Sequence, residues 1–169
     1  AIALNGDGTE CVVVTHDPTS GVSSLERFAV PGLAGLGGIA LSTPVPQVTY
    51  NRYASAQLDR NGDTLFLAAV SGAVVVDVAT GVVRPVPGDP HHTVLDPTGR
   101  RVMRSEGAGL VVGDAVTGAV LGRFAARGAD AYTRLIEFAP HGRFAAVTRL
   151  GSDGVEVFGV GGATPIRWC

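Results

Sequence analysis

Short apolar runs rich in β-branched residues alternate along this chain with turns rich in Asp, Pro and Gly. The runs at 12–14, 74–76 and 111–112 are examples, and each is bounded by Gly, Asp, Ser or Pro, as short strands are. No window keeps apolar residues at helical spacing for more than about a turn before Gly or Pro interrupts it. The pattern therefore predicts an all-β chain without long helices.

The same pattern divides the chain into four groups of four antiparallel strands, with boundaries near 1–53, 54–90, 91–132 and 133–169. The first group is expected at 2–4, 10–16, 22–30 and, less regularly, around 39–42. The second is expected at 54–58, 64–70, 73–78 and 82–86, and the third at 93–95, 101–105, 109–114 and 119–125. The fourth is expected at 134–138, 144–149, 155–158 and 165–168.

A turn motif recurs in these groups at a nearly constant interval. Its glycines, Gly62, Gly99 and Gly142, follow one another at 37 and 43 residues, and the Thr-Gly pairs ending at Gly81 and Gly118 are also 37 apart. Repeats of about 40 residues made of short strands are typical of β-propeller blades. A β-sandwich also has many short strands but needs no such recurrence. We therefore predict a β-propeller or partial propeller of about four blades, forming a single domain.

Several segments resemble known propeller repeats. Residues 136–147 with 152–158 are similar to bacterial WD40-like repeats, and 75–81 and 95–102 resemble the YVTN-type repeat. The resemblance covers 54–162 well and implies a scaffold or sensor surface, by analogy of fold. WD40-like wedges usually form rings of more than four blades. The resemblance therefore implies either a ring closed by four or end blades covered by a second copy, another chain or the rest of a longer polypeptide.

Composition and charge narrow the function classes. The 169 residues are 46% hydrophobic and 17% charged, a globular composition, and the net charge of −2 gives no sign of a nucleic-acid or membrane partner. No apolar stretch reaches the roughly 20 residues that span a bilayer. We therefore expect a soluble protein, in the cytoplasm rather than secreted. A chain that begins at Ala1 is expected to be a processed precursor or a segment of a longer one.

The two cysteines, Cys11 and Cys169, stand near opposite ends of the sequence. A ring brings the first and last blades together, so a disulfide between them is conceivable. Cys11 also lies in an apolar run, where a small buried thiol is ordinary. We favour the buried thiol.

Two groups of polar residues could carry chemistry, and for each we favour a structural interpretation. His91 and His92 could bind one metal only from an irregular loop, because neighbouring strand residues point to opposite faces. His16 and Asp17 could belong to a nucleophilic site with Ser20, Ser23 and Ser24, but 17–21 has the composition of a turn.

Three further features could be read as binding sites for phosphate, nucleic acid or ions, and for each we favour a structural interpretation. Gly35, Gly37 and Gly38 weakly resemble a phosphate loop, yet no Lys follows, so we expect a flexible insertion. The basic cluster of Arg100, Arg101 and Arg104 lacks aromatic neighbours for stacking bases, which favours a solvated rim with Glu106 as an ion-pair partner. The Asp residues of the repeated Asp-x-x-Thr-Gly units are expected to stabilise turns rather than to bind ions.

Propeller topology places the connections between blades, and those between the second and third strands of a blade, on one face. We expect partner binding on that face, because Tyr and Arg are favoured anchors at protein interfaces. The candidate residues are Tyr50, Arg52, Tyr53, Asp89, His91, His92, Asp130, Tyr132 and Arg134.

The sequence thus favours a non-catalytic scaffold or sensor module with a protein partner, without catalytic residues, metal or cofactor. Homo-oligomerisation, or the remaining blades of a larger propeller, is the other expected kind of partner. The alternative is a ligand-binding or enzymatic propeller, quinoprotein-like or a hydrolase, with part of its site outside this chain.

Overall fold

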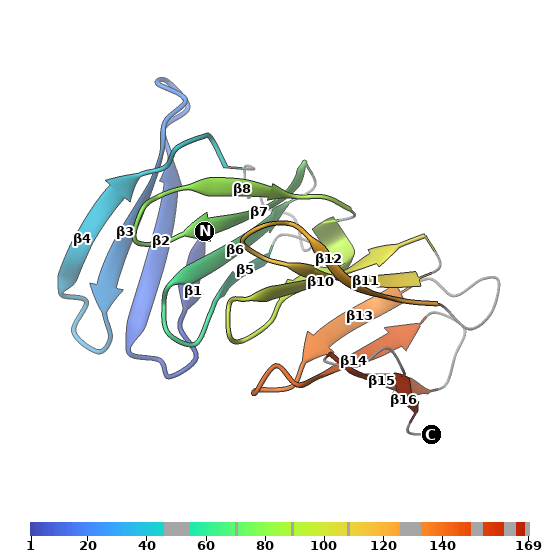
Figure 1. Ribbon diagram of the computed structural model, residues 1–169. Coiled ribbons are helices and arrows are strands. Elements are labelled where there is room, and N and C mark those ends of the chain that lie inside the picture. Colours follow the sequence, from blue (N-terminus) through green and yellow to red (C-terminus); the bar gives the residue numbers. More distant parts are fainter. Residues whose placement is uncertain are drawn as a thin grey trace. The chain divides into compact units, whose positions relative to one another are not determined.

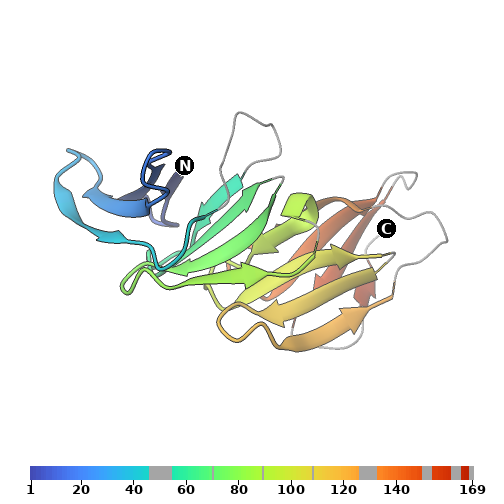
Figure 2. The ribbon, with the colours of Figure 1, turned by 90° about the horizontal axis from the view of Figure 1, so that it is seen from above.

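The computed structural model describes residues 1–45, 55–69, 71–88, 90–107, 109–125, 133–149, 154–160 and 165–167. Their strands form four antiparallel sheets of four strands each, and within every sheet the strands are ordered as they follow one another in the chain (Figure 1). The chain completes one sheet before it enters the next, as the colours in Figure 2 show.

The strand bounds follow the predicted groups closely. The first sheet contains β1 (Ile2–Leu4), β2 (Glu10–His16), β3 (Ser23–Ala29) and β4 (Gly35–Ala40). The second contains β5 (Ser55–Leu58), β6 (Thr64–Ala69), β7 (Gly72–Asp77) and β8 (Val83–Val86). The third contains β9 (Thr93–Leu95), β10 (Arg101–Glu106), β11 (Gly109–Asp114) and β12 (Val120–Phe124). The fourth contains β13 (Thr133–Phe138), β14 (Phe144–Arg149), β15 (Val155–Gly159) and β16 (Pro165–Arg167).

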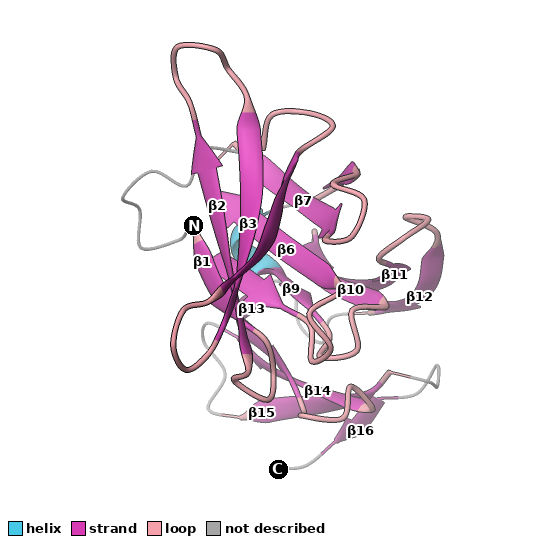
Figure 3. Cartoon of the chain, turned by 90° about the vertical axis from the view of Figure 1, so that its left-hand side faces the viewer, coloured by secondary structure: helices cyan, strands magenta, loops and turns pink. Residues whose placement is uncertain are grey.

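One local prediction needs correction. The glycine-rich segment expected to be a flexible insertion is strand β4, which begins at Gly35 and pairs with β3 through a bulge between Arg27 and Phe28. Glycine has no side chain to keep it from a strand, and the ladder needs only its backbone. The connection before β9 contains the short 3₁₀ helix η1 (Pro90–His92), drawn in cyan in Figure 3.

The chain divides into two units, Ala1–Pro87 and Gly88–Cys169. In the first unit, the first strands β1 and β5 of its two sheets lie next to each other. An apolar core joins these two sheets, with Val12, Val14 and Leu25 from one and Leu65 and Leu67 from the other. These residues share a face because side chains alternate along a strand.

The second unit repeats this plan. Strands β9 and β13 are neighbours, and the core between their sheets is built from Met103, Leu110, Phe124, Val147 and Phe158, among others. The rings of Phe124 and Phe158 are tilted by 59° with centroids 5.2 Å apart. Each unit is thus a pair of sheets packed face to face.

Candidate functional site

Every sheet has two ends with different contents. The turn between its second and third strands and its links to neighbouring sheets lie at one end, here called the connection end; it includes 17–22, 41–45, 87–88 and 90–92. The turns between first and second and between third and fourth strands lie at the other, here called the turn end. Antiparallel order within each sheet dictates this separation.

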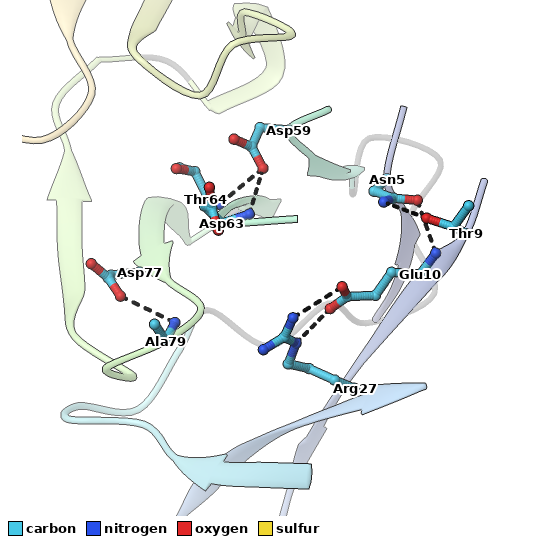
Figure 4. Close-up of polar contacts among 9 residues, drawn as sticks. All are labelled: Asn5, Thr9, Glu10, Arg27, Asp59, Asp63, Thr64, Asp77 and Ala79. Carbon is cyan, nitrogen blue, oxygen red and sulfur yellow. Dashed lines mark hydrogen bonds and ion pairs between the residues drawn. The ribbon is translucent and has the colours of Figure 1, made fainter. Parts of the chain in front are cut away.

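At the turn ends, one polar side chain closes the first turn in three of the four sheets. Asn5 Oδ1 accepts the backbone N–H of Glu10 at 3.0 Å. Asp59 Oδ1 accepts those of Asp63 and Thr64 at 2.7 and 3.0 Å (Figure 4). Asp96 Oδ1 accepts the backbone N–H groups of Arg100 and Arg101 at 2.9 and 3.2 Å. These side chains satisfy N–H groups that the tight turn leaves unpaired.

Aspartates also close the turns between third and fourth strands. Asp77 Oδ1 accepts the N–H groups of Ala79 and Thr80 at 3.1 and 2.9 Å, and Asp114 Oδ1 accepts those of Val116 and Thr117 at 2.9 and 2.7 Å. Hydrogen bonds from Thr80, led by its side chain, lower the pKa of Asp77, and those from Thr117, led by its backbone, lower the pKa of Asp114. As predicted, these carboxylates stabilise turns.

A carboxylate of one sheet also packs against a turn glycine of its neighbour in each unit. Glu10 forms a bidentate ion pair with Arg27, at 2.5 and 3.0 Å (Figure 4), and its Oε2 lies 3.1 Å from where a methyl group on Gly62 would stand. Asp96 Oδ2 stands at the same distance from such a methyl on Gly142. Both glycines have positive φ, so the close approach and the backbone conformation both favour Gly.

Substitutions of the buried Asp59 test how much its hydrogen bonds at the turn end contribute to stability. Asp59 is only 2% exposed, and burial raises its pKa. Replacing it with Ala leaves two N–H groups without their acceptor and is expected to cost about 1–3 kcal/mol. Asp59→Asn keeps an accepting oxygen, as Asn5 does in the first sheet, and is expected to be at least as stable as the wild type at pH 7.

The pH dependence follows from the direction of the shift. A raised folded pKa means that the native state holds the Asp59 proton more tightly than the unfolded chain does. The resulting stability is present below the ordinary Asp pKa of about 3.9 and is lost as the pH rises through the folded pKa. The advantage of Asp59→Asn in urea unfolding should therefore grow from pH 3.5 to pH 7. An advantage that shrinks with rising pH would contradict this account.

At the connection end of the first sheet, the segment considered for a nucleophilic site forms a turn, as favoured from the sequence. His16 Nδ1 lies 3.1 Å from Ser23 Oγ. Asp17 instead accepts the Thr19 N–H at 2.8 Å and the Ser20 hydroxyl at 2.6 Å, and the Ser20 side chain is the first cause of its lowered pKa. The turn interpretation of 17–21 is confirmed.

The connection end of the third sheet holds a charged cluster. Glu106 accepts a hydrogen bond from Arg123 at 3.0 Å and one from Arg104 at 3.4 Å; the bond from Arg123 is the main cause of its lowered pKa. The expected pair of Arg104 with Glu106 is present.

The expected solvated rim is wrong for Arg104, because its side chain is only 7% exposed. Methyl groups placed on Gly88 and Gly113 would lie 2.7 Å from its Cδ and 3.3 Å from its Nη1. Two glycines therefore leave the space that the side chain fills. Within the described part of the chain its Nε has no hydrogen-bond partner. Sequence reasoning missed this burial because those glycines are far from Arg104 in the sequence.

The structure places only part of the predicted recognition set. His91 and His92 lie on η1, at the connection end just before β9. For Arg134 the structure gives the backbone, within β13. The others lie outside the described residues: Tyr50, Arg52, Tyr53, Asp89, Asp130 and Tyr132. Cys11 is buried with a free thiol, and Cys169 lies outside the described residues.

The described residues show neither a metal-binding cluster nor a helix that could span a membrane. Among them, no group of three or more His, Cys, Asp or Glu side chains is arranged to hold a metal ion. None of their helices has the length and apolar character needed to cross a membrane.

No protein-family model matches this sequence, and no curated protein matches it. Solved structures do. U3-55K matches with a TM-score of 0.61 and 11% identity, over 98% of this chain and 50% of that one. The β-propeller domain of Cps50 (Swd1) from Myceliophteria thermophila matches with a TM-score of 0.58 and 12% identity, over 94% of this chain and 51% of that one. A functionally unknown protein from Desulfotomaculum acetoxidans DSM 771 matches with a TM-score of 0.53 and 14% identity, over 98% of this chain and 54% of that one.

These likenesses show the fold. The chain is an all-β β-propeller or partial propeller, and its four antiparallel sheets are the blades. The prediction made from the repeat is confirmed. The chain spans about half the length of the structures that it matches.

Proposed function

We propose that this chain is a non-catalytic β-propeller interaction module, of the bacterial WD40-like or YVTN type, that binds a protein partner through the connection ends of its blades. The main support is the contrast between the polar side chains of the turn ends and those at the connection end of the third blade. At the turn ends, Asn5, Asp59, Asp77, Asp96 and Asp114 all accept hydrogen bonds from the chain's own backbone. Those side chains are occupied by the fold.

The connection end of the third blade carries exposed charged side chains and two histidines. Arg123 is largely exposed and Glu106 is nearly half exposed, while η1 carries His91 and His92 at the same end. Arginine combines large contact area with fixed hydrogen-bond geometry and is enriched where interfaces gain most of their affinity. We add Glu106 and Arg123 to the recognition residues proposed from the sequence.

A triple substitution tests the binding face. Changing Tyr53, His92 and Tyr132 to Ala should remove partner binding with little loss of folding. Tagged wild-type chain would capture proteins from lysate of cells that produce it, and quantitative mass spectrometry would compare the variants. The control changes three exposed turn-end residues, Arg60, Arg100 and Arg143, to Ala.

A partner that falls at least about tenfold with the first triple variant and stays with the control supports the proposal; a tenfold change corresponds to about 1.4 kcal/mol. Equal capture by both variants would remove the assignment of the face. Metal analysis and an absorption spectrum of the purified chain test the non-catalytic part. A stoichiometric metal or a visible chromophore would overturn it in favour of an enzymatic propeller.

A further inference from the structure

The fourth blade carries large apolar side chains on both faces. One face carries Ile136, Ala145, Val147 and Phe158, which are buried in the core of the second unit. The opposite face, here called the outer face of the fourth blade, carries Leu135, Phe144 and Val155, and all three are exposed. The exposed Glu137 lies on the same face, opposite Ala146. The strand register aligns this face, because Thr148 of β14 stands opposite both Leu135 and Val155.

Strands of the second and third blades are apolar on both faces too, and in them both faces are buried. Every residue of β6 from Leu65 to Ala69 is buried, and β7 and β11 are buried along four successive residues. Because successive side chains point to opposite faces, these strands are covered on both sides. A blade that is apolar on both faces is accordingly suited to a neighbour on each.

The first blade has a matching outer face. Ile2 and Leu4 are exposed on β1, with Ile2 at 68%, while Ala3 between them is buried in the core of the first unit. The register sets Val13 opposite Ile2, and Cys11 opposite both Leu4 and Phe28. Apolar side chains therefore line most of this face as well, and the exposed Glu26 stands on it opposite Val13. Exposed apolar faces of this kind on a soluble chain mark places where another surface binds.

We propose that a second copy of this chain covers these faces, the outer face of the first blade of one copy packing on the outer face of the fourth blade of the other. Two observations favour a second copy over another partner. The faces have the alternation of blade interiors, so they fit another blade. The chain also spans about half of the propeller structures that it matches, and two copies supply eight blades, within the roughly four to eight of propellers.

Such a contact joins different surfaces of the two copies, and two equivalent contacts close the pair. Light scattering coupled to size-exclusion chromatography over a dilution series is expected to give twice the 17.2 kDa mass of one chain. A wild-type chain that stays monomeric across the series would overturn the proposal, in favour of another protein or of further blades of a longer polypeptide.

A matched pair of leucines locates the contact. Leu135 and Leu121 are 54% and 55% exposed, and both lie on strands of the second unit. Leu135→Glu places a charge in the proposed dry contact and should weaken the dimer at least about tenfold, whereas Leu121→Glu on β12 should leave it unchanged. Far-UV circular dichroism would verify that both variants keep their β structure. Equal dimerisation of both variants, or equal loss, contradicts the assignment.

Mixing two variants tests the head-to-tail arrangement. Ile2→Glu should weaken the dimer as Leu135→Glu does, because it spoils the other half of the same contact. A mixture of the two variants can form pairs with one intact contact, between Leu135 of one copy and Ile2 of the other. Native mass spectrometry should therefore show mixed dimers above the level of either variant alone. If Ile2→Glu has no effect, or the mixture shows no recovery, the arrangement is wrong.

Discussion

Phe158→Ala is expected to lower the free energy of unfolding by about 3–5 kcal/mol, the cost of removing a large side chain from a packed core. Phe158 is 1% exposed and belongs to the core that joins the third and fourth blades. Its ring packs in a tilted arrangement on Phe124, a geometry that adds to simple burial. The substitution therefore removes one of the two phenylalanine side chains buried in that core and leaves a cavity between two blades.

Urea unfolding followed by circular dichroism measures this effect. Leu121→Ala is the control, since this exposed residue of β12 should change stability by no more than about 0.5 kcal/mol. Phe158→Leu, which keeps most of the apolar volume, should fall between the two. A loss below about 1 kcal/mol for Phe158→Ala would mean that the two blades do not depend on this core.

Gly81→Ala is expected to cost about 2–4 kcal/mol, because backbone strain and a backbone clash coincide at this turn. Gly81 has a φ of +70°, and an added methyl group would lie 2.6 Å from the carbonyl oxygen of Ala40. The same turn is bonded to the segment that follows β4, since the Ser42 N–H donates to the Gly81 carbonyl at 2.9 Å and Ser42 Oγ accepts the Val83 N–H at 2.9 Å. The methyl group would push apart the two blades of the first unit.

Gly118→Ala separates the two causes. Gly118 occupies the same place in the third blade with a φ of +72°, and no atom lies within 4 Å of an added methyl group. It should therefore cost only the conformational strain, about 1 kcal/mol. Thermal unfolding of both variants measures the difference. Equal losses would show that the contact between Gly81 and Ala40 contributes nothing.

Most strands were predictable because side-chain chemistry repeats with the structure. Asp96 and Gly99 mark a turn through two separate requirements, a carboxylate that accepts backbone N–H groups and a residue with positive φ. The apolar runs between such turns leave little choice of secondary structure. The fourth strand of the first blade was expected around 39–42 rather than at Gly35–Ala40, because the glycines at its start provide no alternation of polar and apolar side chains for a sequence pattern to show.

The candidate site was less predictable than the fold. That Asp77 and Asp114 close turns followed from their repeated spacing. The burial of Arg104 did not, because charged residues are seldom buried and the space for its side chain comes from Gly88 and Gly113, which no local pattern connects with it. The proposed binding face follows from topology, and its aromatic members remain predictions.

The order of strands within each sheet also has a kinetic consequence. Every strand pairs with the one before or after it in the chain, so no sheet has to wait for a distant segment. Chains whose contacts are close in sequence search fewer conformations and tend to fold fast. During synthesis each blade can accordingly assemble soon after its own residues leave the ribosome and serve as a template for the next, which limits the time that apolar strands are open to aggregation.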